Sequence, residues 1–193
     1  GNPSLKPETA KTWSVGTTLK PQSLPDFSLG LNYFSVDYES QIASVLNDTT
    51  VLQRAGDYAS LIRRFSPALT TAQILADAQV AALIGAGGGT LNLPATSAYI
   101  IDARPLNLGK TATRGVDFDL AWRHELGKGQ LHATLAGAWL QKFDLQQTTT
   151  SAVVSQLNNL NYPLKLKARG SLGWKHDRFD STLFLNYANA YNN

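Results

Sequence analysis

Apolar and polar side chains alternate along several stretches of the chain, most regularly between residues 163 and 175. One set of alternate positions there is mainly apolar and consists of Leu164, Leu166, Ala168, Leu172 and Trp174. The positions between them carry the polar set Lys165, Lys167, Arg169 and Ser171. A period of two is typical of a β-strand with one buried face. A strand between lipid and a water-filled lumen needs the same pattern.

Six stretches alternate in this way, and each reaches the ~9–11 residues that a membrane-spanning strand needs. The predicted strands cover about residues 9–20, 26–38, 111–124, 130–145, 163–175 and 179–188. No apolar run approaches the ~20 residues of a membrane helix. The sequence therefore predicts an all-β fold, an antiparallel up-and-down transmembrane β-barrel segment. Bacterial single-chain barrels start at about 8 strands, so these six belong to a larger barrel.

The lengths of the connections also follow the wiring of bacterial barrels, in which tight periplasmic turns alternate with longer extracellular loops. The predicted links are short at 21–25, 125–129 and 175–178, long at about 41–110 and intermediate at 146–162. This orientation places Trp13, Trp139 and Tyr187 near the outer interface. It places Phe27, Trp122, Trp174 and Phe179 near the periplasmic one. Such paired belts of aromatic residues are typical of membrane proteins.

The long extracellular loop at about 41–110 is expected to be partly helical. Thr70 and Gln73 have the spacing of a capping box, and the Ala-rich stretch Ala72–Ile84 predicts a helix after them. A shorter helix is expected at Ala59–Phe65, ended by Pro67. We also expect a flexible run at Gly85–Thr90 and a small strand at Tyr99–Ala103.

Composition excludes several classes of function. The net charge is only +3 and the basic residues form no dense cluster, so no nucleic-acid partner is expected. The chain has no Cys, which excludes disulfides and thiolate chemistry. His124, His132 and His176 lack the spacing of metal ligands, and no nucleophile and base occur together. We therefore expect no enzyme, no catalytic residues, no metal site and no cofactor.

Two motifs carry a resemblance to a known family. Residues 1–8, Gly-Asn-Pro-Ser-Leu-Lys-Pro-Glu, resemble the Gly-Asn-Pro-x-Leu-Lys-Pro-Glu segment that precedes a strand in TonB-dependent outer-membrane receptors. Residues 107–119, which run from Asn107 through Gly109 and Gly115 to Asp119, resemble a strand entry of the same family. The resemblance covers essentially the whole chain, residues 1–193, and suggests the later part of the receptor barrel.

The resemblance implies a 22-stranded barrel in the outer membrane of a Gram-negative bacterium, filled by an N-terminal plug domain. Such receptors import scarce nutrients, most often a ferric siderophore, with energy from TonB. The chain has no Met, so we expect a processed or excised piece of a longer protein. Its implied partners are outer-membrane lipid, the plug domain, the nutrient, and TonB through the N-terminal part. Asp117 and Asp119 are expected to meet basic partners on neighbouring strands or on the plug.

Ligand recognition is expected in the long loop, where aromatic and cationic residues suit an anionic ferric chelate. The candidate residues are Arg54, Tyr58, Arg63, Arg64, Tyr99 and Arg104. The alternative is a soluble β-sandwich that acts as a binding or adhesion module, which explains the alternation but not the loop lengths. A substitution on the apolar face distinguishes the barrel from the sandwich. A charge at Leu135 or Leu166, near mid-bilayer, should cost about 2–4 kcal/mol in a barrel.

Overall fold

The computed structural model describes residues 2–45, 50–87 and 94–192. The chain divides into two compact units. The loop unit consists of Gly1–Thr9, Tyr38–Lys110 and Gln146–Val153. The strand unit consists of Ala10–Asp37, Thr111–Leu145 and Val154–Asn193.

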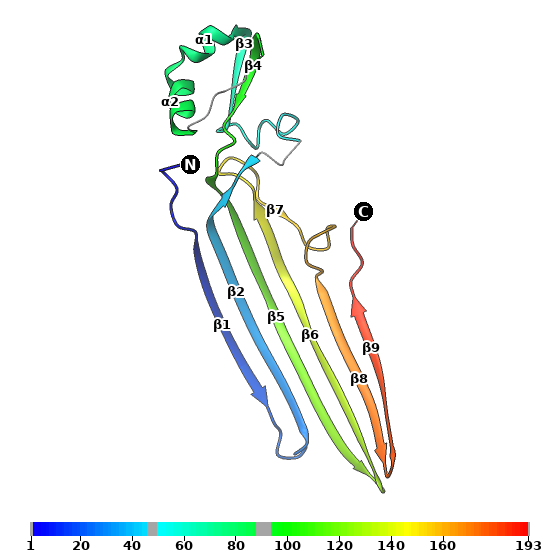
Figure 1. Ribbon diagram of the computed structural model, residues 1–193. Coiled ribbons are helices and arrows are strands. Elements are labelled where there is room, and N and C mark those ends of the chain that lie inside the picture. Colours follow the sequence, from blue (N-terminus) through cyan, green and yellow to red (C-terminus); the bar gives the residue numbers. More distant parts are fainter. Residues whose placement is uncertain (1, 46–49, 88–93, 193) are drawn as a thin grey trace. The chain divides into compact units, whose positions relative to one another are not determined.

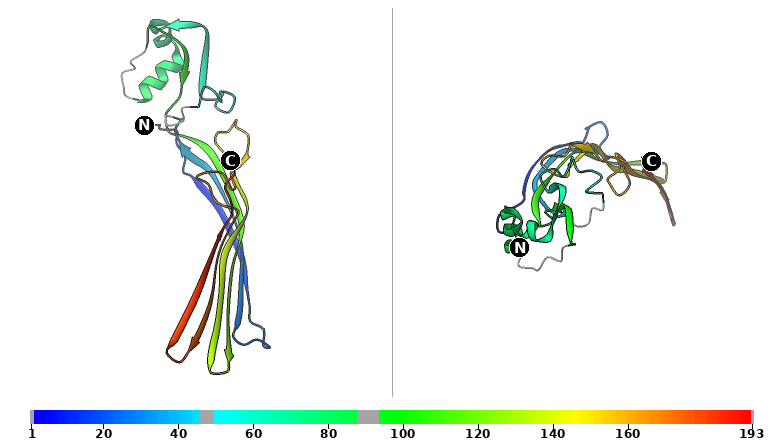
Figure 2. Two further views of the ribbon diagram at one scale, coloured as in Figure 1. Left: turned by 90° about the vertical axis from the view of Figure 1, so that its right-hand side faces the viewer. Right: turned by 90° about the horizontal axis from the view of Figure 1, so that it is seen from above.

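The main sheet contains all six predicted strands, in the order β1-β2-β5-β6-β8-β9 (Figure 1). Their bounds are Thr9–Leu19 (β1), Phe27–Ala43 (β2), Leu106–Leu126 (β5), Gly129–Gln146 (β6), Leu166–His176 (β8) and Phe179–Ala188 (β9). A short strand, β7 (Val154–Ser155), pairs with the end of β6. In the described residues this is one open, curved layer with no second sheet stacked on it (Figure 2). A two-layer β-sandwich is therefore not the architecture of the strand unit.

Two strands are longer than the alternation predicts. The prediction ended the second strand near Tyr38 and began the third at Thr111, but β2 continues to Ala43 and β5 starts at Leu106. With 17 and 21 residues, both exceed the ~9–11 residues that cross a bilayer. Within the extension of β2, Ser40 has a φ of 58°, a left-handed conformation that re-aims the strand locally.

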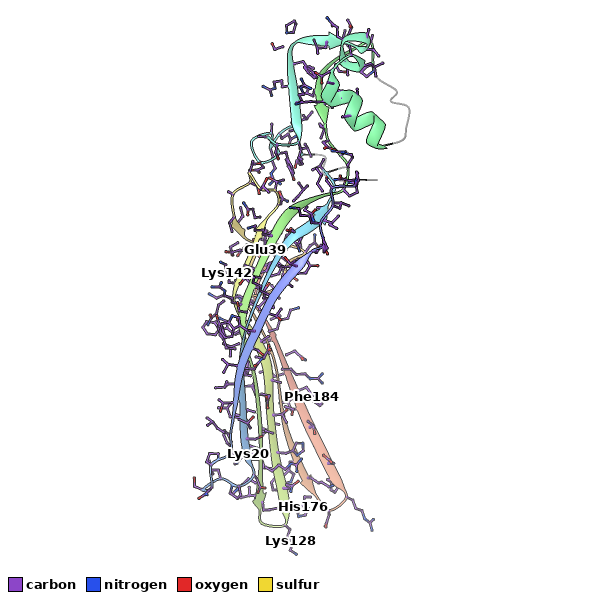
Figure 3. All side chains as sticks on the ribbon, turned by 90° about the vertical axis from the view of Figure 1, so that its left-hand side faces the viewer. Lys20, Glu39, Lys128, Lys142, His176 and Phe184 are labelled. Carbon is purple, nitrogen blue, oxygen red and sulfur yellow. The ribbon has the colours of Figure 1, made fainter. Side chains whose placement is uncertain are left out.

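Short turns join the strands at one end of the sheet. β5 and β6 connect through Gly127 and Lys128, and β8 and β9 connect through Asp177 and Arg178. Gly127 and Asp177 have φ values of 63° and 50°, as the tightest hairpin turns require. Figure 3 shows Lys128 and His176 at this end of the strands.

The strand register confirms that the apolar positions share one face. Leu135 pairs with Gly170, which pairs with Leu185, and Leu172 lies between Ala133 and Leu183. The side chains on this face are largely exposed, with Leu183 at 71% and Leu185 at 73%. We call it the outward face. Such an exposed apolar surface is unfavourable in water and suits a lipid environment.

The outward face carries aromatic residues at two levels. Trp139 pairs with Leu166, and Leu131 pairs with Trp174, so the levels are eight residues apart along β8. At ~3.3 Å per residue this is ~26 Å along the strand, or ~19 Å along the membrane normal for a tilt of ~45°. The value is on the scale of the ~25 Å apolar band of an outer-membrane barrel. Trp13 contacts Tyr33, with ring centroids 5.3 Å apart.

The elements of the loop unit differ from the prediction in two places. The predicted helix at Ala59–Phe65 is wrong, because a strand, β3 (Ile62–Thr70), starts there and pairs with β4 (Thr96–Ile101). The predicted helix at Ala72–Ile84 is in fact two helices, α1 (Thr71–Leu75) and α2 (Ala78–Gly87). β4 confirms a small strand in this region, although it begins before Tyr99 and ends before Ala103.

Local capping explains where these helices begin and end. The Thr70–Gln73 capping box is present at the start of α1, as predicted. Asp77 interrupts the Ala-rich run because its carboxylate accepts hydrogen bonds from the backbone N–H groups of Gln79 and Val80. Of the predicted flexible run Gly85–Thr90, residues 85–87 belong to α2, and the rest lies outside the described residues.

The loop unit has a hydrophobic core. Its buried members are Val45, Val51, Tyr58, Leu61 and Leu108. Ile62, Ile101, Ala103 and Leu106 pack against them. Since Ile62 and Ile101 begin the β3–β4 pair, this core forms the base of the hairpin.

Candidate functional site

The base of the loop unit is held by polar contacts between two connections of the main sheet. The hydroxyls of Thr148 and Thr150 both donate to the backbone carbonyl of Asp57. The Arg54 guanidinium pairs with the Asp57 carboxylate at 2.8 Å and also donates to Gln147. Tyr58, at 4% exposed, donates its hydroxyl to the same Gln147 oxygen at 3.3 Å. Of these two residues, both predicted to contact ligand, Tyr58 is buried and Arg54 is exposed, and both hydrogen-bond to Gln147 within the loop unit.

Arg104 is also engaged inside the loop unit. Its Nε and Nη2 atoms donate to the two carboxylate oxygens of Asp102, at 2.9 and 2.7 Å. This bidentate hydrogen bonding lowers the pKa of Asp102 below its usual range. The Arg104–Asp102 ion pair stabilises the backbone between β4 and β5.

The other three predicted residues meet on the β3–β4 hairpin. Arg64 pairs directly with Tyr99, and its guanidinium lies 5.2 Å from the centre of the Tyr99 ring. Both side chains are exposed, Tyr99 by 40%. Arg63 lies on the opposite face of the hairpin and contacts the ring of Phe65 at 5.3 Å. The hairpin therefore presents a cation on each face.

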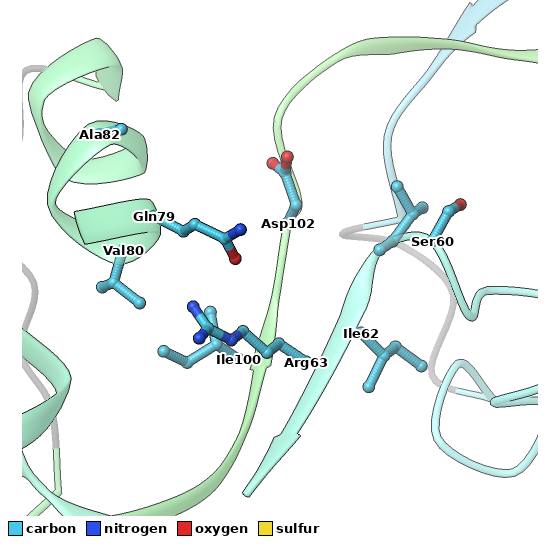
Figure 4. Close-up of a pocket in the computed structure, with 9 residues that line it drawn as sticks. Ser60, Ile62, Arg63, Gln79, Val80, Ala82, Ile100 and Asp102 are labelled. Carbon is cyan, nitrogen blue, oxygen red and sulfur yellow. The ribbon is translucent and has the colours of Figure 1, made fainter. Parts of the chain in front are cut away.

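A cavity of about 520 Å³ lies between the Arg63 face of the hairpin and α2 (Figure 4). Its lining is mainly apolar with a few polar groups, and consists of Ser60, Leu61, Ile62, Arg63, Gln79, Val80, Ala82, Ile100 and Asp102. Figure 4 shows the side chains of Arg63 and Gln79 extending toward each other from the hairpin and α2. The volume is in the ~300–1,000 Å³ range of small-molecule sites.

Arg63 is oriented at the cavity by Asp77, whose carboxylate it contacts at 2.5 Å. The Arg63 hydrogen bond is the main reason that the pKa of Asp77 lies below its usual range, so the pair is fully charged at neutral pH. Asp77 was missed by the sequence analysis. Its signal was an N-cap residue just before an Ala-rich run.

The cavity has the chemistry of a binding site. An apolar wall with one guanidinium and one amide suits a small molecule that has an acidic or hydrogen-bonding group on an apolar body. Among the described residues no three His, Asp or Glu side chains lie close enough together to hold a metal ion.

The polar face of the main sheet carries the remaining predicted charges. Asp117 and Asp119 were expected to meet basic residues on neighbouring strands or on the plug. Within the described residues neither carboxylate has a hydrogen bond or ion pair, so the neighbouring strands do not supply the basic partner. The Asp119 carboxylate instead lies over Gly30, where a Cβ atom would overlap it.

Comparison with known protein families decides the assignment. A family model described as TonB-dependent receptor-like β-barrel matches residues 1–193. The chain belongs to this family. Neither the curated proteins nor the solved structures gave a significant match. No helix in the described part of the chain is long and apolar enough to cross a membrane.

Membership of the TonB-dependent receptor barrels explains the exposed outward face. The family is located in the Gram-negative outer membrane, so the outward side chains face lipid and the polar face lines the lumen. It is a family of transport receptors and not an enzyme family. The strands are therefore part of an outer-membrane active-transport protein.

Proposed function

We propose that the chain is part of a receptor that imports a ferric siderophore and is energised by TonB, with the loop unit on the extracellular side. The connectivity supports this placement, since the segment between β2 and β5 leaves the sheet at the end opposite the short turns. In this proposal the plug domain and the TonB contact are supplied by other parts of the receptor.

The proposed class of ligand is inferred from two consecutive arginine residues on the β3–β4 hairpin. Arg63 and Arg64 point to opposite faces, one toward the cavity and one toward the exposed Tyr99 ring. A guanidinium binds carboxylate and hydroxamate-like oxygens through several hydrogen bonds and attracts an anionic chelate. Of the six predicted contacts, the proposal therefore retains Arg63, Arg64 and Tyr99.

Excision of the hairpin tests the proposal. Ile62 pairs with Ile101, so residues 63–100 can be replaced by an Asn-Gly turn that leaves the core contacts of both Ile residues in place. We expect the full receptor to lose at least tenfold in affinity for its ferric siderophore, measured by fluorescence quenching. The matched control is Arg123→Gln on β5 of the strand unit, which should leave affinity unchanged. Equal affinity of the excised and intact receptors would refute the proposal.

A further inference from the structure

One arginine of the main sheet has its side chain on the outward face, among residues that contact lipid. A Cβ at Gly137 would lie 2.6 Å from the Phe118 ring, and Gly137 alternates in phase with Leu135 and Trp139 on the outward face. Phe118 is therefore an outward residue. Arg114 lies four residues before Phe118 on the same strand, β5, so its side chain has the same orientation.

Gly115 provides an independent check of this orientation. A Cβ atom at Gly115 would meet the side chains of Phe34 and Leu140. Leu140 follows Trp139 in β6 and therefore points to the polar face of the sheet. Gly115 belongs to the same polar face, and Arg114, its neighbour in the strand, belongs to the outward face.

Arg114 lies just beyond the aromatic level at the end of the sheet opposite the short turns. Counting back from the two-residue turn between β5 and β6 places Val116 opposite Trp139, and Arg114 opposite Gln141. Two residues along a strand are ~7 Å, or ~5 Å along the membrane normal for a tilt of ~45°. Aromatic belts lie at the level of the lipid headgroups. The Arg114 guanidinium therefore lies in the headgroup layer.

The Arg114 side chain is held loosely within the strand unit. Its one ion pair among the described residues is with Asp37 on β2, at 3.8 Å, which is too long for a hydrogen bond. The buried Nε atom has no hydrogen-bond partner there either. Both side chains of the pair are more than 40% exposed. β2 and β6 flank β5, so no other strand of a barrel adjoins Arg114, and a plug inside the barrel cannot reach the outward face.

A second cation lies on the outward face near the same height. Asp37 shares this face with Arg114, and Tyr33 lies four residues before Asp37 in β2. Trp13 contacts Tyr33, so Trp13 and Lys11, two residues before it in β1, also face outward. Lys11 is exposed. We call Lys11, Asp37 and Arg114 the headgroup patch.

We propose that Lys11 and Arg114 of the headgroup patch bind the phosphate group of a membrane lipid whose acyl chains lie against the apolar outward face. A guanidinium presents several N–H donors to phosphate oxygens, and a lysine adds a point charge. Asp37 holds Arg114 when no lipid is bound and competes with the phosphate. A lipid fits the patch better than a free anion does, because the cations border an apolar surface of the same face. The inference rests on the proposed function only for the leaflet, which is the outer one when the loop unit is extracellular.

The test is native mass spectrometry of the purified full receptor in detergent, with dioleoyl phosphatidic acid as the probe. Dioleoyl phosphatidylcholine, which has the same acyl chains but a choline on its phosphate, is the control lipid and should bind more weakly. We expect Arg114→Gln to raise the Kd for phosphatidic acid about fivefold. Lys11→Gln should raise it by less.

Two further variants separate binding from a structural role. Asp37→Asn removes the competing carboxylate and should lower the Kd for phosphatidic acid about twofold or more, because each charge near a membrane surface is worth about that much. If the Arg114–Asp37 pair merely stabilised the sheet, both variants would change binding in the same direction. The matched control Arg123→Gln removes one cation from the polar face of the same strand and should bind phosphatidic acid normally.

Four results would overturn the inference. They are equal binding of the two lipids by the native receptor, equal Kd values for Arg114→Gln and Arg123→Gln, weaker binding by Asp37→Asn, and displacement of phosphatidic acid by inorganic phosphate. The last result would mean that the patch binds a free anion. A receptor without residues 63–100 should still bind phosphatidic acid, which separates this outcome from that of the siderophore proposal.

Discussion

Of the eight hydrophobic side chains that are buried among the described residues, seven belong to the loop unit and one, Leu164, to the strand unit. The loop unit buries its apolar side chains as a water-soluble domain does. The strand unit leaves Trp13, Leu183 and Leu185 more than half exposed. The burial of apolar side chains in each unit matches its surroundings, which are water for the loop unit and lipid for one face of the strands.

The difference shows why low charge and alternation do not by themselves identify a soluble fold. Backbone hydrogen bonds hold the described sheet together, and its apolar contacts are made across neighbouring strands. Stability of the loop unit depends instead on a small core around Tyr58 and Leu61. Equivalent substitutions in the two units should therefore have different consequences.

The largest difference is expected for a leucine truncated in each unit of the full receptor. Leu61→Ala removes a side chain that is 7% exposed and should reduce the free energy of unfolding of the loop unit by about 2–5 kcal/mol. The matched variant Leu183→Ala changes a side chain on the outward face. Hydrogen exchange of the loop backbone should accelerate in the first variant only. Acceleration in both variants would mean that the units share one core.

A charge on the outward face tests the lipid side of the comparison. Leu135 lies midway between the two aromatic levels, so Leu135→Arg should cost about 2–4 kcal/mol in folding into lipid vesicles. Leu166 is in register with Trp139, nearer an interface than the mid-bilayer depth expected from the sequence. Leu166→Arg should therefore cost about 0–1 kcal/mol. Equal costs at both positions would show that depth in the membrane has been assigned wrongly.

Glycine substitutions measure how tightly the strands pack without a core. A Cβ at Gly137 would lie 2.5 Å from the Lys167 backbone oxygen and 2.6 Å from the Phe118 ring. Gly137→Ala should cost about 1–3 kcal/mol as overpacking. At Gly170, on the same face, the nearest atom would be 3.6 Å away, so Gly170→Ala should be almost neutral. The midpoints of urea unfolding of the two variant receptors in lipid vesicles measure the difference. Equal midpoints would contradict the close packing around Gly137.

The smallest effect is a pH dependence of the loop unit. Arg63 lowers the pKa of Asp77 in the folded state. The ion pair therefore contributes its full stabilisation of the loop unit above the unfolded-state pKa of ~3.9. The contribution is lost as the pH falls through the lower, folded value. Asp77→Asn keeps an N-cap residue but removes the charge. The variant should show a weaker increase in proteolysis of residues 62–87 below about pH 4. An unchanged pH profile would mean that the ion pair adds no stability.

The sequence predicted the strand unit better than the loop unit, for a physical reason. A period of two over ten residues specifies both a strand and its faces, and all six strands are present. The sequence did not predict the end of β2 or the start of β5. Beyond the bilayer both faces of these strands contact water, so apolar and polar residues no longer alternate there. The second half of the helix predicted at Ala59–Phe65 belongs to β3, because its pairing with β4 decides its conformation.

The candidate site was predictable in composition but not in arrangement. Arg63, Arg64 and Tyr99 lie on one hairpin, whereas Arg54, Tyr58 and Arg104 form hydrogen bonds with other residues of the loop unit. Asp57 and Asp102 are local partners, three residues from Arg54 and two from Arg104, but Gln147 lies 93 residues from Arg54 in the sequence. The cavity beside α2 depends on the break at Asp77, which is visible only once its capping role is recognised.

The central claim is that alternate residues of the main sheet face lipid and the lumen. Single cysteines at each position from 165 to 175 can carry a spin label in the full receptor once any Cys outside this chain has been replaced; the chain itself has none. The account predicts that oxygen dissolved in lipid reaches the labels at 166, 168, 170, 172 and 174. A water-soluble nickel reagent should reach those at 165, 167, 169, 171, 173 and 175. Equal access of the nickel reagent to both sets would contradict a membrane-spanning strand.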